Sequence, residues 1–81
     1  MPGKIRIIIA DDHPIFRGGL RQIISADESI EIIGEADNGE KALEIIQELK
    51  PDIAVLDIDM PKKTGLDVLR ELKDSSTKII F

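Results

Sequence analysis

The sequence predicts an α/β fold in which a doubly wound parallel sheet has the strand order 2-1-3-4. Four short aliphatic segments alternate with three segments whose apolar residues recur with the period of a helix. Such alternation is typical of a parallel sheet with helices on both faces. Because crossovers between parallel strands are right-handed, a central first strand flanked by the second and third strands gives this order.

The first strand and the first helix are expected on either side of an acidic pair. Residues 5–10 form an apolar run interrupted only by Arg6, which is typical of a buried strand, and the run ends at Asp11 and Asp12. Pro14 indicates the start of a helix, since proline is favoured at the first helical position. One face of this helix carries apolar side chains at helical spacing, namely Phe16, Leu20, Ile23 and Ile24.

The second strand and the second helix repeat this arrangement. Residues 30–36 form the strand, in which Glu31 and Glu35 indicate a more exposed edge. Asp37 or Asn38 is expected to cap the helix that follows. The apolar stripe of that helix consists of Ala42, Leu43, Ile45, Ile46 and Leu49.

The third unit follows the same pattern and leads into a fourth strand. Residues 53–56 form the third strand, which ends at Asp57, and a loop follows at residues 58–65. The fourth strand is predicted at residues 78–81. The third helix lies between them and carries the apolar residues Leu66, Val68, Leu69 and Leu72.

Length, composition and charge exclude several classes of protein. The 81 residues allow one small domain, and the absence of cysteine excludes disulfides and thiolate metal sites. A net charge of −5 disfavours nucleic-acid binding by this chain, because that function needs a basic patch. No apolar run reaches the ~20 residues that span a bilayer. No membrane contact and a cytoplasmic location are therefore expected.

Acidic side chains are expected to converge at one edge of the sheet. Asp11 and Asp12 follow the first strand, Asp57 follows the neighbouring third strand, and Asp59 lies two residues beyond. Clustered carboxylates need either protonation of one group or a hard cation such as Mg²⁺, which prefers oxygen ligands. With one histidine and no cysteine, a zinc site is not expected.

Asp57 is the best candidate for a nucleophile in this cluster. A carboxylate beside Mg²⁺ can attack phosphorus and form an aspartyl-phosphate, while the metal neutralises developing charge. Asp57 projects from a strand end into a loop, whereas Asp12 precedes a helix and has an alternative role as its N-cap. Acids after strands are also commonly solvated loop residues, so a purely structural interpretation stays open for each of them.

Two segments, IIIADDHPIFRGGL and AVLDIDMPKKTGLDVL, resemble the receiver domain of two-component response regulators. The matching features are the acidic pair after the first strand and the D-x-x-M-P-x-x-x-G stretch that begins at Asp57. The first segment is similar to the subfamily whose receivers carry a C-terminal helix-turn-helix DNA-binding domain. The resemblance covers essentially the whole chain and implies a flavodoxin-like receiver fold.

The resemblance implies a role for each acidic residue. Asp57 would accept a phosphoryl group from a histidine kinase and would also contact the metal. Asp12 would be the main Mg²⁺ ligand, and Asp11 would help through water or hydrogen bonds. Asp59 would contribute its backbone carbonyl, and its side chain would help to set the lifetime of the phosphoryl group.

The resemblance also implies structural roles in the loop after Asp57. Met60 and Pro61 would shape this loop, Pro61 through its fixed φ. Gly65 would let the loop turn into the third helix. His13 has no assigned chemistry in the family and is interpreted as a polar residue at a helix start.

The chain lacks several parts of the family's domain. That domain has five βα units, whereas residues 1–81 contain three and the beginning of a fourth, so they are interpreted as a partial receiver domain. The family's switch Ser or Thr, its phosphate-pairing Lys and the output domain are absent from this chain. The resemblance therefore implies weak or no phosphotransfer by this chain, and contact with DNA only through the missing output domain.

The predicted fourth strand favours self-association. Its segment, TKIIF, would form an exposed apolar edge of the sheet, and such edges invite pairing with another chain. A two-fold homodimer is expected, either through this edge or through exchange of elements.

Two alternative functions stay open. AVLDIDM also resembles the nucleophile strand of haloacid-dehalogenase-type phosphatases, in which Asp57 would be the nucleophile and Asp59 the general acid/base. That motif usually lies on the first strand, a Thr or Val usually follows its second Asp, and it leaves Asp11 and Asp12 without a role. The other alternative is a receiver-like interaction module that is not phosphorylated. The chain is expected not to be a turnover enzyme.

Overall fold

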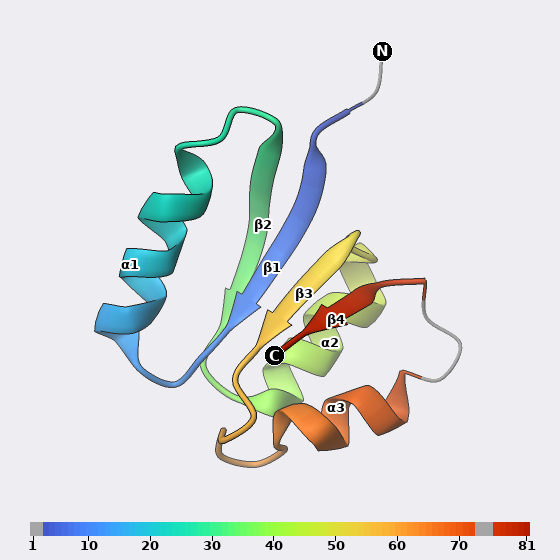
Figure 1. Ribbon diagram of the computed structural model, residues 1–81. Coiled ribbons are helices and arrows are strands. Elements are labelled where there is room, and N and C mark those ends of the chain that lie inside the picture. The colour runs from blue at the N-terminus through green and yellow to red at the C-terminus, as the bar shows by residue number, and fades with distance from the viewer. Residues whose placement is uncertain (1–2, 73–75) are drawn as a thin grey trace.

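The computed structural model describes residues 3–72 and 76–81, which form a four-stranded parallel sheet with three helices (Figure 1). The strand order is β2-β1-β3-β4, as predicted. The strands are β1 (Ile5–Ala10), β2 (Ile30–Ala36), β3 (Ile53–Leu56) and β4 (Lys78–Ile80). The helices are α1 (Pro14–Ser25), α2 (Gly39–Leu49) and α3 (Gly65–Glu71).

The main core lies between the sheet and helices α2 and α3. Ile8, Ala54 and Leu56 of the strands belong to one buried cluster with Leu43 of α2 and Val68 of α3. Complete burial of a large aliphatic side chain contributes about 1.5–3 kcal/mol to stability. This cluster therefore holds the two central strands and two of the helices in a defined arrangement.

The register of the two central strands determines where the acidic residues lie. Ala10 of β1 pairs with Leu56 of β3, so the next residues of the two strands, Asp11 and Asp57, emerge side by side. The backbone N–H of Asp57 donates to the carbonyl of Ala10 at 2.9 Å. The backbone N–H of Asp11 donates to the carbonyl of Ala36 in β2 at 3.0 Å. Both acidic residues are thus tied to the sheet by their backbones.

The N-cap residues of α1 and α2 decide between the alternatives that the sequence left open. Asn38, rather than Asp37, caps α2, because its side-chain oxygen accepts the backbone N–H of Lys41 at 2.8 Å. The N-cap of α1 is His13, whose side chain makes no capping hydrogen bond. The alternative in which Asp12 caps this helix is therefore wrong, and its carboxylate is left available for another role.

The three helices are short. They contain 12, 11 and 7 residues, and within the described segments none has the length and apolar character that a membrane span requires. The shortest, α3, begins with a capping box. Its Thr64 hydroxyl accepts the Asp67 N–H, and the Asp67 carboxylate accepts the Thr64 N–H, both at 3.1 Å.

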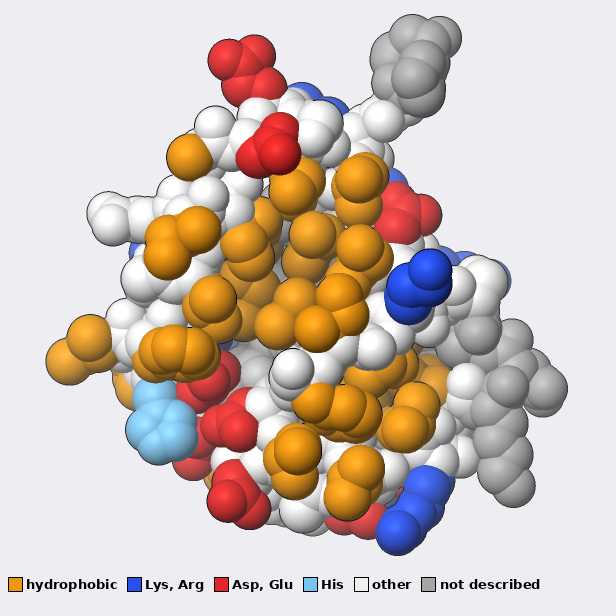
Figure 2. Space-filling view, in the orientation of Figure 1, with side chains coloured by type: hydrophobic (Ala, Val, Ile, Leu, Met, Phe, Trp, Pro, Cys, Tyr) orange, Lys and Arg blue, Asp and Glu red, His pale blue; other side chains and the backbone are white. Residues whose placement is uncertain are grey.

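The second face of the sheet is covered only in part. Among the described helices α1 alone packs on this face, and hydrophobic side chains are open to solvent there (Figure 2). The apolar stripe predicted for α1 forms, but Phe16 is 59% and Ile23 is 73% exposed. These side chains stay in solvent because, in the described part of the chain, no second helix lies against them.

Candidate functional site

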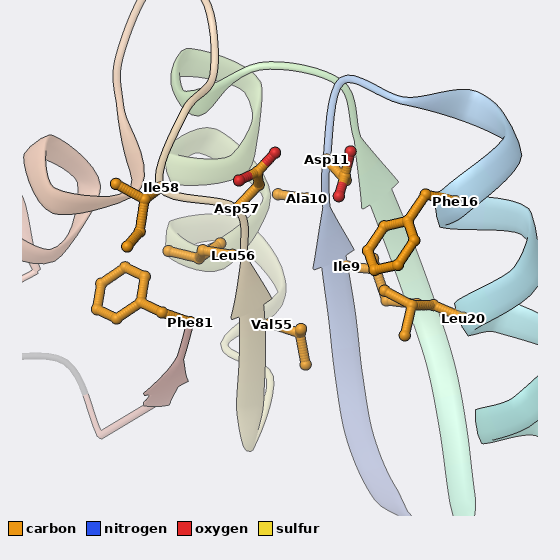
Figure 3. A pocket seen from close by; sticks show the side chains of 10 residues that line it. All are labelled: Ile9, Ala10, Asp11, Phe16, Leu20, Val55, Leu56, Asp57, Ile58 and Phe81. Carbon is orange, nitrogen blue, oxygen red and sulfur yellow. The ribbon is translucent and has the colours of Figure 1, made fainter.

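Three carboxylates meet at the carboxyl ends of β1 and β3, as the strand order predicts. The side chain of Asp11 is 7% exposed, that of Asp57 27% and that of Asp12 34%. One ligand atom from each of them and one from His13 lie within 4.8 Å of one another. Figure 3 shows Asp11 and Asp57 side by side beyond the ends of their strands. The cluster is partly buried and still accessible from solvent.

Asp11 is held in place by its neighbours on α1. Its carboxylate accepts the backbone N–H of His13 at 2.7 Å. Its backbone carbonyl accepts Nη1 of Arg17 at 2.6 Å, and Nε of Arg17 donates to Glu35 of β2 at 3.1 Å. Arg21, four residues later on the helix, donates to the second oxygen of Glu35 at 3.1 Å. Arg17 therefore links the segment after β1 to β2, and Arg21 adds a second contact between α1 and β2.

His13 belongs to the cluster, a placement that sequence reasoning missed. Its Nδ1 lies 2.9 Å from Oδ1 of Asp11, 2.9 Å from Oδ1 of Asp12 and 3.8 Å from Oδ2 of Asp57. The hydrogen bond with Asp11 is the main reason that the pKa of His13 lies above its ordinary value of 6.5, and the charge of Asp12 adds to this effect. The feature of the sequence that could have indicated this placement is the position of His13 immediately after two acids.

The loop after β3 supports the carboxylate of Asp57. The backbone N–H of Asp59 donates to Oδ1 of Asp57 at 3.3 Å, while the residue itself is exposed. Met60 is 6% exposed and joins the main core. The carbonyl of Pro61 accepts the backbone N–H of Lys63 at 2.8 Å. The loop is therefore attached to the core just beyond the cluster.

Glycines permit two close backbone approaches around this loop. A Cβ on Gly65 would lie 2.7 Å from the carbonyl oxygen of Asp57, and one on Gly39 would lie 1.8 Å from that of Lys63. Neither glycine has a positive φ, and the left-handed residue of the loop is Lys62, with φ 70°. Gly65 is therefore required because there is no room for a side chain, and not because its backbone conformation needs glycine. The role of Gly39 was missed, because a D-N-G sequence is also typical of an ordinary turn.

An apolar groove of about 360 Å³ adjoins the cluster on the partly covered face of the sheet (Figure 3). Asp11 and Asp57 lie at one end of it. Its apolar lining comes mainly from Ile9, Phe16, Leu20, Val55, Ile58 and Phe81. The polar site is thus bordered by hydrophobic surface on this side.

The donor set fits a hard divalent cation. Asp11, Asp12 and Asp57 supply three carboxylates, and Mg²⁺ is typically held by a few carboxylates, with water or phosphate oxygens completing an octahedron. Their accessible side leaves room for those further ligands. His13 is the one basic side chain within 4.0 Å of these acids' carboxylates among the described residues.

The comparisons with known proteins agree with this geometry. The family model of the response regulator receiver domain matches residues 7–81. The nitrate/nitrite response regulator protein NarL of Escherichia coli (strain K12) is 43% identical over 70 residues, which are 86% of this chain and 32% of that protein. The transcriptional regulatory protein DegU of Brevibacillus brevis is 38% identical over 69 residues, 85% of this chain and 29% of that protein.

A solved structure shares the whole described fold. The signal receiver domain of the response regulator NarL from Mycobacterium tuberculosis superposes with a TM-score of 0.93 at 39% identity, covering 96% of this chain and 64% of that one. This chain spans about a third of the length of the two curated relatives. The family match favours the receiver interpretation over the phosphatase one. The chain therefore belongs to the response regulator receiver domain family, as its sequence match, strand order and acidic cluster show.

Proposed function

We propose that this chain is a phosphoacceptor in which Asp57 receives a phosphoryl group from a histidine kinase. The observation that carries the proposal is the position of the Asp57 carboxylate beside Asp11 and Asp12 in a chain of the receiver family. A carboxylate oxygen of Asp57 forms a bond to phosphorus as the bond between phosphorus and the kinase histidine nitrogen breaks. The released imidazole takes up a proton from solvent.

Mg²⁺ is the proposed cofactor. The carboxylates of Asp11, Asp12 and Asp57 and the backbone carbonyl of Asp59 would hold it, Asp11 in part through water. When bound, the ion neutralises charge on the phosphoryl oxygens. Without it, three carboxylates in one cluster would repel an incoming phosphoryl group.

The surroundings of Asp57 support its role as the nucleophile. Its backbone N–H is bonded to β1, its carbonyl lies against Gly65, and its Oδ1 accepts the Asp59 N–H at 3.3 Å. These contacts restrict the carboxylate, while Oδ2, which lies 3.8 Å from Nδ1 of His13, is proposed to attack phosphorus. Met60, Pro61 and Gly65 are proposed to keep the loop in this shape.

The activity of the whole protein is proposed from its relatives. One of them is named a transcriptional regulatory protein, and this chain covers 29% of its length. We propose control of transcription through a helix-turn-helix output domain beyond the receiver, with DNA contacted by that domain alone. A cytoplasmic location follows from this role, since transcription takes place at the DNA.

Phosphorylation is tested with a small-molecule phosphodonor and intact-mass spectrometry. We expect Mg²⁺-dependent addition of one phosphoryl group to the wild type and none to Asp57→Asn. The labelled fraction should be low, because among residues 3–72 and 76–81 the Asp57 carboxylate has no lysine ion pair that could hold the phosphoryl oxygens. Asp37→Asn is the matched control, since Asp37 is an exposed acid that follows β2 at the same edge of the sheet.

Two outcomes would contradict this proposal. Labelling that persists in Asp57→Asn would place the phosphoryl group elsewhere, and equal loss in Asp37→Asn would mean that general charge matters rather than position. Steady turnover of an aryl phosphate that is abolished by Asp59→Asn would instead indicate a phosphatase. The proposed phosphoacceptor shows no such turnover.

We also propose that two copies of the chain associate through β4. Within the described residues β4 has a neighbouring strand on one side only. Ile80 at this edge is 46% exposed, and Phe81 beside it is 51% exposed. Antiparallel pairing of two such edges about a two-fold axis would use the free backbone groups and cover these side chains. Exchange of elements between copies is the alternative route to the same dimer.

A further inference from the structure

The imidazole of His13 lies where three carboxylates converge. Its Nδ1 is 2.9 Å from one oxygen of Asp11, 2.9 Å from one oxygen of Asp12 and 3.8 Å from one oxygen of Asp57. His13 is the only histidine of the chain, and the chain has no cysteine. The ring of His13 is therefore the only imidazole or thiolate donor that the sequence can bring to the cluster.

The imidazole of His13 has too few protons at Nδ1 to hydrogen-bond both neighbouring carboxylates. A ring nitrogen carries at most one hydrogen, so Nδ1 can donate fully to only one of the two carboxylates at 2.9 Å. The second oxygen then faces Nδ1 without a proton of its own. A single cation could instead be bound by Nδ1 and by an oxygen of each carboxylate.

The spacing of the donor atoms matches that of neighbouring ligands around one ion. With metal–ligand bonds of about 2.1 Å, two ligands at right angles lie about 3.0 Å apart. The two Nδ1–oxygen distances of 2.9 Å agree with this value. The ring is 68% exposed, so a small rotation is free to turn the Nδ1 lone pair toward an ion.

We infer that His13 is a nitrogen ligand of this site and gives it a preference for divalent transition-metal ions over Mg²⁺. The inference rests on the proposed metal site and adds a ligand to it. Imidazole suits ions such as Ni²⁺, Co²⁺ and Zn²⁺, whereas Mg²⁺ takes oxygen ligands almost exclusively. The sequence disfavours a zinc site because it offers one histidine and no cysteine. In the folded chain, that one imidazole lies among three carboxylates, which can also act as ligands of such ions.

Calorimetric titration of the untagged protein at pH 8 tests the inference, because a higher pH favours the neutral imidazole that binds a metal ion. Ni²⁺ and Mg²⁺ are the probes, and His13→Asn is the variant. We expect the substitution to lower the Ni²⁺ affinity about tenfold or more, because an oxygen replaces a nitrogen ligand. The Mg²⁺ affinity should stay unchanged. Since Asn is among the best N-caps, the variant should keep α1 folded.

A double variant, His13→Asn with Gln22→His, is the matched control. It keeps one histidine in the chain but places it at an exposed position of α1, nine residues further along. We expect it to bind Ni²⁺ as weakly as the single variant. Recovery of wild-type affinity would mean that any surface histidine suffices, and it would overturn the inference.

Nitrogen NMR supplies a readout that is independent of affinity. The single imidazole makes the spectrum unambiguous, and binding of diamagnetic Zn²⁺ through Nδ1 requires the remaining proton to lie on Nε2. We expect Zn²⁺ to shift the Nδ1 resonance and fix this tautomer. An Nδ1 resonance that is insensitive to Zn²⁺ at saturation would exclude the ring as a ligand.

The outcomes separate this inference from the proposed function. Mg²⁺-dependent labelling of Asp57 together with Ni²⁺ affinity that does not depend on His13 would refute the inference alone. Ni²⁺ binding that depends on His13, in a protein whose Asp57 cannot be labelled, would refute the phosphoacceptor proposal alone. Equal loss of Ni²⁺ and Mg²⁺ affinity in His13→Asn would show that the residue shapes the loop rather than selecting the metal.

Discussion

At the scale of single residues, the site depends on close backbone contact as much as on charge. The loop that carries Asp57 lies against the start of α2, where the backbone N–H of Gly39 donates to the carbonyl of Pro61 at 3.4 Å. A Cβ on Gly39 would lie 1.8 Å from the carbonyl oxygen of Lys63, which is closer than any real contact. The loop and the helix can therefore meet in this way only with glycine at position 39.

Gly39→Ala tests this contact. We expect the free energy of unfolding to fall by about 1–3 kcal/mol, because the loop must move to admit the methyl group. Phosphorylation of Asp57 should fall as well. Gly19→Ala is the control, since Gly19 lies in α1 with no atom within 4 Å of the added Cβ. It should raise stability by about 0.5–1 kcal/mol through helix propensity.

Urea denaturation of the two alanine variants measures both effects. Opposite shifts of the unfolding midpoint are expected at equal slope. If Gly39→Ala were as stable as the wild type, the loop would not be held against α2 in solution.

At the scale of elements, α3 depends strongly on its first turn because it has only seven residues. An isolated helix of this length is not stable in water. Its capping box satisfies two backbone N–H groups, those of Thr64 and Asp67. The hydrogen bonds from the backbone and side chain of Thr64 are the main reason that the pKa of Asp67 lies below its ordinary value of 3.8. This carboxylate therefore stabilises the fold when it is ionised.

The lowered pKa of Asp67 predicts a pH dependence of stability. A group whose pKa is lower in the folded state contributes stability that is present above its unfolded value of 3.8 and is lost as the pH falls through the folded pKa. We expect Asp67→Asn to be less stable than the wild type at about pH 6. The difference should shrink as the pH is lowered below 3.8.

Arg70→Gln is the control for this prediction. It removes the ion pair between Arg70 and Asp67, 3.6 Å apart, and leaves the capping box in place. Its unfolding free energy should follow the pH dependence of the wild type, because the Thr64 hydrogen bonds act more strongly on Asp67 than Arg70 does. A constant gap between Asp67→Asn and the wild type at every pH would argue against a role for the charge.

At the scale of the whole molecule, the two faces of the sheet differ. Helices α2 and α3 seal one face over the main core, whereas the other face keeps an open band of hydrophobic side chains beside α1 (Figure 2). Ile80 lies at the β4 edge of this band and pairs with Val55 of β3. Exposed apolar surface next to a free strand edge favours association with another chain.

Ile80→Lys tests association through β4. Analytical ultracentrifugation over a range of concentrations should show a dimer for the wild type and a monomer for the variant, because a charge at a strand edge opposes pairing. Ile15→Lys is the control, since Ile15 is 93% exposed on α1 and lies outside β4. It should leave the dimer intact.

Three results would contradict association through β4. A wild-type monomer at high concentration would exclude self-association altogether. A dimer that survives Ile80→Lys would indicate a different interface, and one that is lost in Ile15→Lys would move the interface to α1.

The acidic cluster lies at the edge of the sheet where the sequence predicts it. Asp11 and Asp57 were predicted to meet because both follow aliphatic runs, and the pairing of Ala10 with Leu56 has this consequence. Asp12 was predicted to join them, and its capping role is excluded by His13 as the N-cap. These placements depend on strand order and chain direction. Both follow from the hydrophobic pattern of the segments together with the right-handedness of crossovers.

The order of the elements, their arrangement in a parallel sheet and the convergence of three acids at one edge could be predicted from the sequence. These features follow from hydrophobic period and from the right-handedness of crossovers, which act over short segments. Three contacts could not be predicted from the sequence: Nδ1 of His13 with the carboxylates, Arg17 with Glu35, and Gly39 with the loop after Asp57. These contacts depend on the exact rotation and distance at which each helix packs on the sheet. The position and rotation of each helix result from the packing of the whole core, so a local sequence pattern does not predict them.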